Sequence, residues 1–158
     1  MNLQKFTQKS IEAIQNAQSY AVEYGNPQIE QQHLLAAFLR QEEGLIPGLL
    51  QKMNVNVNGF LQAVENEVKK LPRVSGGGQT YVDSDLEKTL VAAERLAGNM
   101  TDEYVSVEHI FMAMVNEPNR ALKEIFRQYG VTKEGFLKAL AEVRGNARVT
   151  SYSPEATY

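Results

Sequence analysis

Apolar residues recur along most of the chain at spacings of three and four, the spacing of one face of an α-helix. In residues 7–24, for example, Ala13, Ala17 and Ala21 fall on one face. The alternation of Val, Ile and Thr that is typical of strands is absent. The pattern predicts eight helices near residues 7–24, 31–42, 45–53, 56–71, 84–100, 106–116, 119–129 and 132–145. The predicted fold class is therefore all-α.

The second half of this pattern repeats the first at a fixed offset of 76 positions, the separation of His33 from His109. No gap is needed to keep the two halves aligned. Identical pairs at this offset are Ala17 and Ala93, Ala21 and Ala97, Ala37 and Ala113, Val55 and Val131, and Gly59-Phe60-Leu61 with Gly135-Phe136-Leu137. The sequence therefore predicts two tandem four-helix repeats, which we expect to be related by pseudo-two-fold symmetry.

Residues typical of helix ends support these boundaries. Predicted starts lie at Thr7, at the capping box Ser84-Asp85-Leu86-Glu87, at Ser106 and at Thr132. Predicted ends lie at Gly25, Gly130 and Gly145. We expect one domain over residues 1–145, with repeat one at about 1–71, a glycine-rich loop at 72–83 and repeat two at about 84–145. Residues 146–158 have lost helical periodicity and are predicted to be a linker.

Composition narrows the class of partner. The 158 residues are 43% hydrophobic and 22% charged, which suits one ordinary core. The net charge of −3, with both signs dispersed, does not favour nucleic acid as a partner. There is no cysteine, and no apolar run approaches the length of a signal or a membrane span. We expect a cytoplasmic protein without a membrane partner.

Motifs for catalysis or cofactor binding are missing. The glycines of Ser75-Gly76-Gly77-Gly78 are followed by Gln79-Thr80, not by the Lys and Ser or Thr of a phosphate-binding loop. His33 and His109 each lie in the first turn of a predicted helix, where a ring packs or bonds the local backbone, and no third metal ligand is identifiable. Asp83, Asp85 and Glu87 are better explained as helix-start acids than as a calcium loop. We expect neither an enzyme nor a bound cofactor in this chain.

Several stretches resemble the family of Clp amino-terminal repeat domains. They are Phe6-Thr7, Ala13, Ala17-Gln18, Ile29-Glu30-x-x-His33-Leu34-Leu35-x-Ala37-Phe38-Leu39 and Val105-Ser106-Val107-Glu108-His109-Ile110-Phe111. Lys70-Leu71-Pro72 and Ser153-Pro154-Glu155-Ala156-Thr157-Tyr158 most resemble members from ClpB-type disaggregases. The resemblance covers essentially the whole chain.

This resemblance implies a mobile module above a homohexameric AAA+ ring. Such a module captures unfolded or aggregated polypeptides in a shallow apolar groove and assists their transfer into an ATP-driven pore, together with the DnaK chaperone system. ATP and Mg²⁺ would be bound by the AAA+ domains, to which residues 146–158 would lead. The excised module would be a monomer that binds without turnover.

The resemblance also implies substrate-binding residues, which match here as Thr7, Asp102 and Glu108, near one another on the surface, and Leu96 as a groove wall. The residues themselves allow another interpretation. Thr7 and Glu108 lie at helix starts, where they would cap or favour the helix dipole, and Leu96 has the spacing of a core residue. His109 stands where the family can be apolar.

Three other functions stay open. One is the adaptor-docking domain of a ClpA- or ClpC-type protease unfoldase, which shares the predicted fold. Another is an enzyme that uses His33 or His109 with Glu30 or Glu108. The third is a structural assembly domain, which predicts a concentration-dependent oligomer without client binding.

Overall fold

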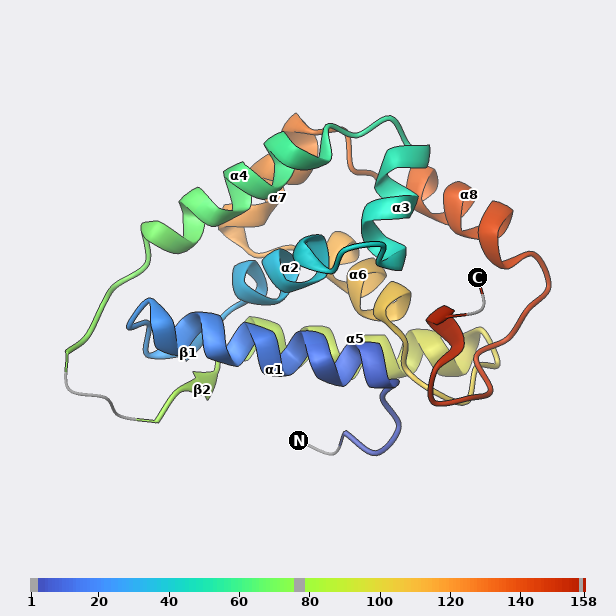
Figure 1. The fold of residues 1–158 in the computed structure, drawn as a ribbon, viewed down its shortest axis with the longest axis horizontal. Helices are drawn as coiled ribbons and strands as arrows, with labels where there is room; N and C mark the ends of the chain where they lie inside the picture. Colours follow the sequence, from blue (N-terminus) through green and yellow to red (C-terminus); the bar gives the residue numbers. More distant parts are fainter. Residues whose placement is uncertain (1–2, 76–78, 157) are drawn as a thin grey trace.

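The computed structural model describes residues 3–75, 79–156 and 158 (Figure 1). All eight predicted helices are found, and the all-α class is confirmed. They are α1 (Gln8–Glu23), α2 (Gln31–Arg40), α3 (Leu45–Lys52), α4 (Val57–Lys69), α5 (Ser84–Asn99), α6 (Val107–Asn116), α7 (Arg120–Gln128) and α8 (Lys133–Arg144). A 3₁₀ turn, η1 (Pro154–Ala156), follows near the end of the chain. Among the described residues, no helix is long and apolar enough to span a membrane.

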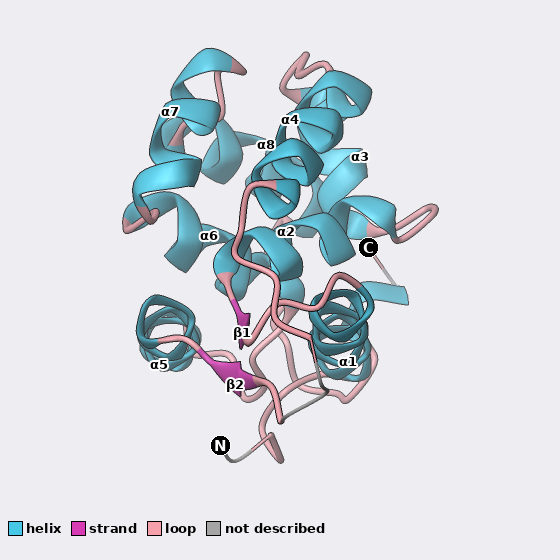
Figure 2. Ribbon diagram, turned by 90° about the vertical axis from the view of Figure 1, so that its left-hand side faces the viewer, coloured by secondary structure: helices cyan, strands magenta, loops and turns pink. Residues whose placement is uncertain are grey.

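The helices form three layers that reflect the sequence repeat. Helices α2 and α6 lie in the middle, α1 and α5 lie below them, and α3, α4, α7 and α8 lie above (Figures 1 and 2). The bounds of α5 and α6 follow those of α1 and α2 at the predicted offset. The two predicted four-helix repeats are therefore confirmed, and each layer holds equivalent helices from both.

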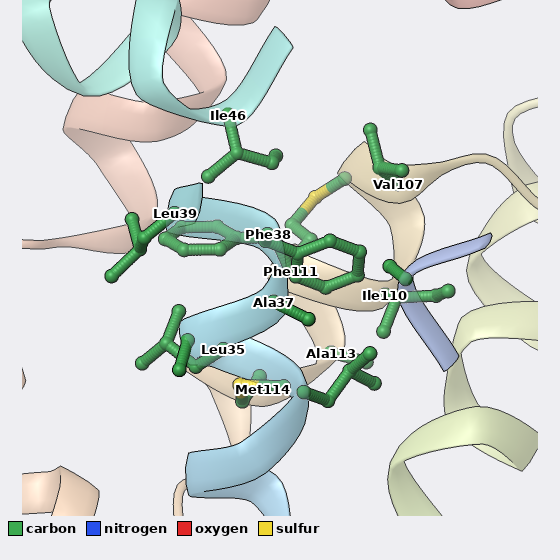
Figure 3. Packing of buried hydrophobic residues seen from close by; sticks show 14 of the residues in the cluster. Leu35, Ala37, Phe38, Leu39, Ile46, Val107, Ile110, Phe111, Ala113 and Met114 are labelled. Carbon is green, nitrogen blue, oxygen red and sulfur yellow. The ribbon is translucent and has the colours of Figure 1, made fainter. Parts of the chain in front are cut away.

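The middle layer forms the centre of the hydrophobic core. Every residue of α2 except the last is buried, and α6 is buried from Val107 to Met114. Phe38 and Phe111 lie near one another in this layer, with Ile46 of α3 close by (Figure 3). The Phe111 ring lies 4.7 Å from that of Phe136 between centroids and 6.2 Å from that of Phe126. One aromatic side chain of α6 thus joins α7 and α8.

The repeats are interlocked through short extended segments that sequence periodicity did not predict. The strand before α2, β1 (Gln28–Ile29), pairs in parallel with the strand before α5, β2 (Tyr81–Val82). In the equivalent place of the other half, Phe6 before α1 pairs with Val105 before α6. Two residues are too few to show alternation. In both pairs, an extended segment that precedes a helix of one repeat is therefore paired with an extended segment of the other repeat.

The predicted helix ends are confirmed with one exception. Thr7 and Thr132 accept hydrogen bonds from the backbone N–H three residues on, and Gly25, Gly130 and Gly145 have positive φ. The cap of α5, however, is Asp83 and not Ser84, because the Asp83 carboxylate accepts the Leu86 N–H at 2.8 Å. Asp83 occupies the position equivalent to Thr7.

The segment that follows the fourth helix of each repeat packs back onto that repeat, and the second of these segments continues to the start of α1 in repeat one. In the inter-repeat loop the Val74 N–H donates to Gly25 O at 2.8 Å and Arg73 Nε to Tyr24 O at 2.9 Å; Gly76, Gly77 and Gly78 lie outside the described residues. Residues 146–156 and 158, which we call the tail, run across the ends of α5 and α6 towards the start of α1 (Figure 1). The boundary at residue 145 and a role of the tail as a linker to a further domain stay predictions.

Because Phe111 joins three helices, we predict that Phe111→Ala lowers the free energy of unfolding by about 3–5 kcal/mol, through lost burial and a residual cavity. Urea denaturation measures this. Val91→Ala on α5, where the side chain is 53% exposed, is the control and should change it by less than about 0.5 kcal/mol. Equal effects of the two changes would contradict the proposed role of Phe111 in the core.

Candidate functional site

Two histidines bond the backbone at equivalent helix starts, as predicted. His33 Nδ1 accepts the Glu30 N–H at 2.9 Å, and His109 Nδ1 accepts the Ser106 N–H at the same distance. Each ring therefore carries its proton on Nε2, which donates to the residue seven positions earlier. The acceptor is an amide oxygen of Asn26 at 2.9 Å for His33 and a carboxylate oxygen of Asp102 at 2.8 Å for His109.

This change from amide to carboxylate is one of three positions where a buried neutral residue of repeat one is replaced by a buried Asp, Glu or Arg in repeat two. Asn26, Gln32 and Val68 of repeat one are equivalent to Asp102, Glu108 and Arg144 of repeat two. Together with His109, the last three residues form what we call the charged cluster. The repeat symmetry is thus broken by electrostatics while the helices remain equivalent.

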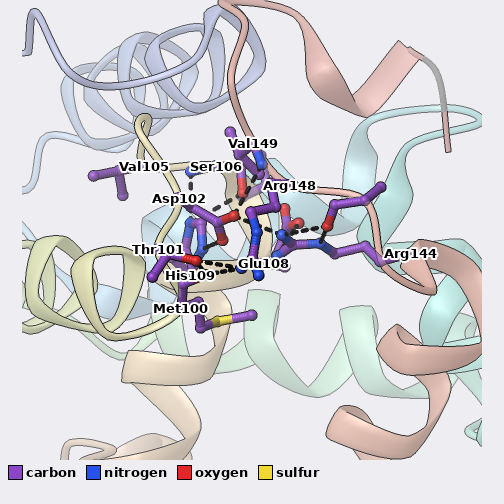
Figure 4. Close-up of polar contacts among 12 residues, drawn as sticks. Met100, Thr101, Asp102, Val105, Ser106, Glu108, His109, Arg144, Arg148 and Val149 are labelled. Carbon is purple, nitrogen blue, oxygen red and sulfur yellow. Dashed lines mark hydrogen bonds and ion pairs between the residues drawn. The ribbon is translucent and has the colours of Figure 1, made fainter.

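The charged cluster is centred on the Arg144 guanidinium (Figure 4). Its Nη2 donates to Asp102 Oδ1 at 2.7 Å, and its Nη1 lies 3.5 Å from Glu108 Oε2. The side chains of Asp102 and Glu108 have no solvent exposure, and that of Arg144 is 6% exposed. Two buried carboxylates therefore share one cation, which is a costly arrangement unless hydrogen bonds compensate.

Hydrogen bonds keep Asp102 charged in spite of its burial. Burial alone would raise the pKa of the Asp102 carboxyl, but hydrogen bonds from Arg144, the Val149 N–H and His109 outweigh it and lower that pKa. Burial likewise opposes the charge of Arg144, yet its two carboxylate neighbours raise the pKa of the guanidinium. Asp102 and Arg144 therefore both stay ionised.

The tail contacts all three polar residues that the sequence predicted. The Val149 N–H donates to Asp102 at 2.9 Å, the Thr7 hydroxyl donates to Glu155 Oε2 at 2.6 Å, and the Tyr158 hydroxyl donates to Glu108. The structure thus brings Thr7, Asp102 and Glu108 together. The expectation that they lie on the surface is wrong here, because Thr7 and Glu108 are fully buried and the 8% exposure of Asp102 comes from its backbone.

Leu96, the predicted groove wall, is partly buried on α5 and packs against the hydrophobic core. A pocket of about 370 Å³ lies beside the charged cluster instead. Its apolar wall is formed by Met100, Leu137, Leu140 and Ala141, and its polar rim by Arg144, Asn146 and Arg148. The substrate-binding roles of Thr7, Leu96, Asp102 and Glu108 stay predictions.

Arg144, Glu155 and Tyr158 were not predicted from the sequence as residues of the site. A signal for Arg144 was present, since it replaces the buried Val68 of repeat one and follows Phe136 and Leu140 on the apolar stripe of α8. Glu155 and Tyr158 belong to the tail, which was interpreted as a linker because it lacks periodicity. Across residues 3–75, 79–156 and 158, no group of three or more acidic or histidine side chains is arranged to hold a metal ion.

Replacing the charged residues of repeat two with neutral residues like those of repeat one tests what the charged cluster contributes to stability. We predict that Arg144→Val lowers the free energy of unfolding by about 3–5 kcal/mol, because it leaves two buried carboxylates without a cation. Adding Asp102→Asn and Glu108→Gln, which reproduces repeat one, should restore part of that loss in urea denaturation.

The matched control for this series is Arg127→Val, which removes an exposed ion pair with Glu124 on α7. It should lower the free energy of unfolding far less than Arg144→Val does, because exposed ion pairs contribute little to stability. If the triple variant is less stable than Arg144→Val, the account of a charge-balanced cluster is wrong.

The buried His33 side chain makes folding stability depend on pH. Burial lowers the pKa of His33 from 6.5 to about 4. The unfolded chain therefore binds a proton on His33 as the pH falls below about 6.5, before the folded chain does, so folding stability decreases between about pH 6.5 and pH 4.

We predict that this decrease is smaller in His33→Gln, whose side chain can still reach the Glu30 N–H but does not titrate. The difference should approach the order of 3 kcal/mol at the acid end of the range. Urea denaturation of both proteins from pH 7 to pH 4 measures it, and parallel profiles would contradict a neutral, buried His33.

Comparisons with known proteins agree with this architecture. A family profile described as the Clp repeat (R) N-terminal domain matches residues 5–129. The protein named chaperone protein ClpB from Nitratidesulfovibrio vulgaris is 42% identical over 163 aligned residues, which cover 100% of this chain and 19% of that protein. The chain thus spans about a fifth of the length of this curated relative.

Solved structures match the fold at lower identity. The Hsp104 N-terminal domain from Candida albicans has a TM-score of 0.85 at 24% identity, over 96% of this chain and 99% of that one. A ClpV N-domain solved in complex with a VipB peptide has a TM-score of 0.72 at 18% identity, over 93% and 94% of the two chains.

Proposed function

The chain belongs to the Clp repeat (R) N-terminal domain family, with relatives named ClpB chaperones, and on this premise we propose that it is the client-binding module of a ClpB-type disaggregase. It captures unfolded or aggregated polypeptides and assists their transfer to an ATP-driven, homohexameric ring in the cytoplasm, together with the DnaK system. ATP and Mg²⁺ are bound by other domains of that protein. The module itself binds without turnover.

The observation that carries this proposal is the broken symmetry of the repeats. In repeat one, the neutral residues Asn26, Gln32 and Val68 occupy these positions and the same helices form. The buried charges at the equivalent positions of repeat two are therefore not required by the architecture. Buried charge generally reduces stability and is concentrated at functional sites. The end that contains Asp102, Glu108 and Arg144 is therefore the better candidate for the binding site.

The pocket beside the charged cluster suits clients of many sequences. Met100, Leu137 and Leu140 offer apolar contact without a fixed hydrogen-bond pattern, and Leu137 is 37% exposed. Such a surface favours weak and permissive binding. Tethering to a ring would raise the effective concentration of a captured client and compensate for low affinity. The complex of a ClpV N-domain with a peptide supports peptide binding by this fold.

The proposal predicts weak, saturable NMR shift changes when the labelled chain is titrated with reduced, carboxymethylated α-lactalbumin, which is permanently unfolded. The shifts should cluster around Met100, Leu137 and Glu108. Native α-lactalbumin is the matched control and should cause none. An absence of shifts with the unfolded protein would contradict client capture.

Substitutions separate the two candidate apolar walls. If the pocket binds the client, Leu137→Ala should weaken binding by about three- to tenfold, the effect of losing part of one buried Leu side chain. If Leu96 forms the wall, Leu96→Ala should have that effect instead. Val91→Ala, on the same helix as Leu96 and 53% exposed, is the control for both.

A further inference from the structure

The tail forms hydrogen bonds with polar groups of the candidate site that a captured client would otherwise have to bond. Thr7, Asp102 and Glu108 are each hydrogen-bonded to a different part of the tail, at Glu155, Val149 and Tyr158. All three are buried. Within the described residues, the candidate site is therefore occupied by a segment of the same chain.

The far end of the tail binds in the way that an acidic peptide would. Glu155 Oε2 accepts the Thr7 hydroxyl at 2.6 Å and the Val107 N–H, in the first turn of α6, at 3.2 Å. Backbone N–H groups of a first helical turn lack partners within the helix, and the helix dipole favours negative charge there. The carboxylate of Glu155 thus joins the starts of α1 and α6.

This far contact is held less firmly than the near one. Burial raises the pKa of the Glu155 carboxyl; the hydrogen bonds from Thr7 and Val107 oppose the increase, and the charge of Glu108 adds to it. Glu155 Oε1 is buried without a hydrogen-bond partner among the described residues. By contrast, Val149 is fully buried, and its backbone is bonded to both Asp102 and Glu103. Between the two contacts, Ser151, Tyr152 and Ser153 are exposed.

We propose that residues 151–156, together with Tyr158, are a releasable strap that competes with client for the starts of α1 and α6. Val149 keeps the strap attached while its distal part leaves. The incoming segment then has to supply an acceptor in place of Glu155, which favours client segments with an acidic side chain. This inference rests on the proposed client-binding function and adds a regulation of its site.

A reversible lock tests the strap in the whole chain. Ser153 Oγ donates to Gln8 Oε1 at 3.0 Å, and the chain contains no cysteine, so Gln8→Cys with Ser153→Cys offers a single disulfide across this contact. Neither residue belongs to the charged cluster. Mass spectrometry verifies the bond, and binding of reduced, carboxymethylated α-lactalbumin is measured in the oxidised and reduced states of the same protein.

We expect the oxidised protein to bind this client at least about tenfold more weakly than the reduced protein, because the strap cannot leave. Equal binding in the two states would overturn the strap while client capture stands. Binding in neither state, and none by the unsubstituted chain, would refute the proposed function itself and with it any competition.

Glu155→Ala provides the opposite change. It should strengthen client binding by about tenfold, the effect of removing one hydrogen bond to a charged group from the competing strap. The Gln8 N–H, which donates to Tyr152 O at 2.9 Å and does not contact Glu155, should show a changed NMR signal without client, which reports release of the strap independently of binding. Glu134→Ala, at an exposed site on α8, is the matched control. Unchanged affinity and unchanged signals in Glu155→Ala would overturn the proposal.

Discussion

A buried guanidinium that must be matched by carboxylates is the constraint on which the candidate site depends. Arg144 lies on the apolar stripe of α8, where its equivalent in repeat one is Val68, and its side chain is almost entirely buried. Asp102 and Glu108 supply the opposite charge from the α5–α6 connection and from the first turn of α6. The cluster thereby fixes three separate segments relative to one another.

The repeat architecture lets the fold tolerate the buried charged cluster. The exchanged entry segments, Phe6 with Val105 and β1 with β2, hold the two repeats together at both ends, and the apolar layer of α2 and α6 lies between them. The end with Asn26 and His33 shows that this scaffold forms with neutral partners. The charged end can therefore differ in chemistry without a change in helix positions, and it is the end on which the tail lies.

Much of the fold could be predicted from the sequence because its signals are local. Periodic apolar residues, the cap at Thr7 and the glycine at residue 25 all act within one helical turn of the boundary that they mark. The extended pairs were missed because each is stabilised by a partner far along the chain. In the site, Thr7, Asp102 and Glu108 were named from family resemblance, whereas their burial under the tail depends on contacts such as Thr7 with Glu155, 148 positions apart. A segment without periodicity gives no indication of where it packs.

The proposed client site lies beside the charged cluster. Intermolecular NOEs between an unfolded, protonated client and the methyl groups of this chain, deuterated at its other carbon-bound positions, test this placement. NOEs to the methyl groups of Met100 and Leu137, in the pocket beside Arg144, are expected. NOEs confined to Val22 and Val74, which are exposed in a different pocket near the inter-repeat loop, would contradict it.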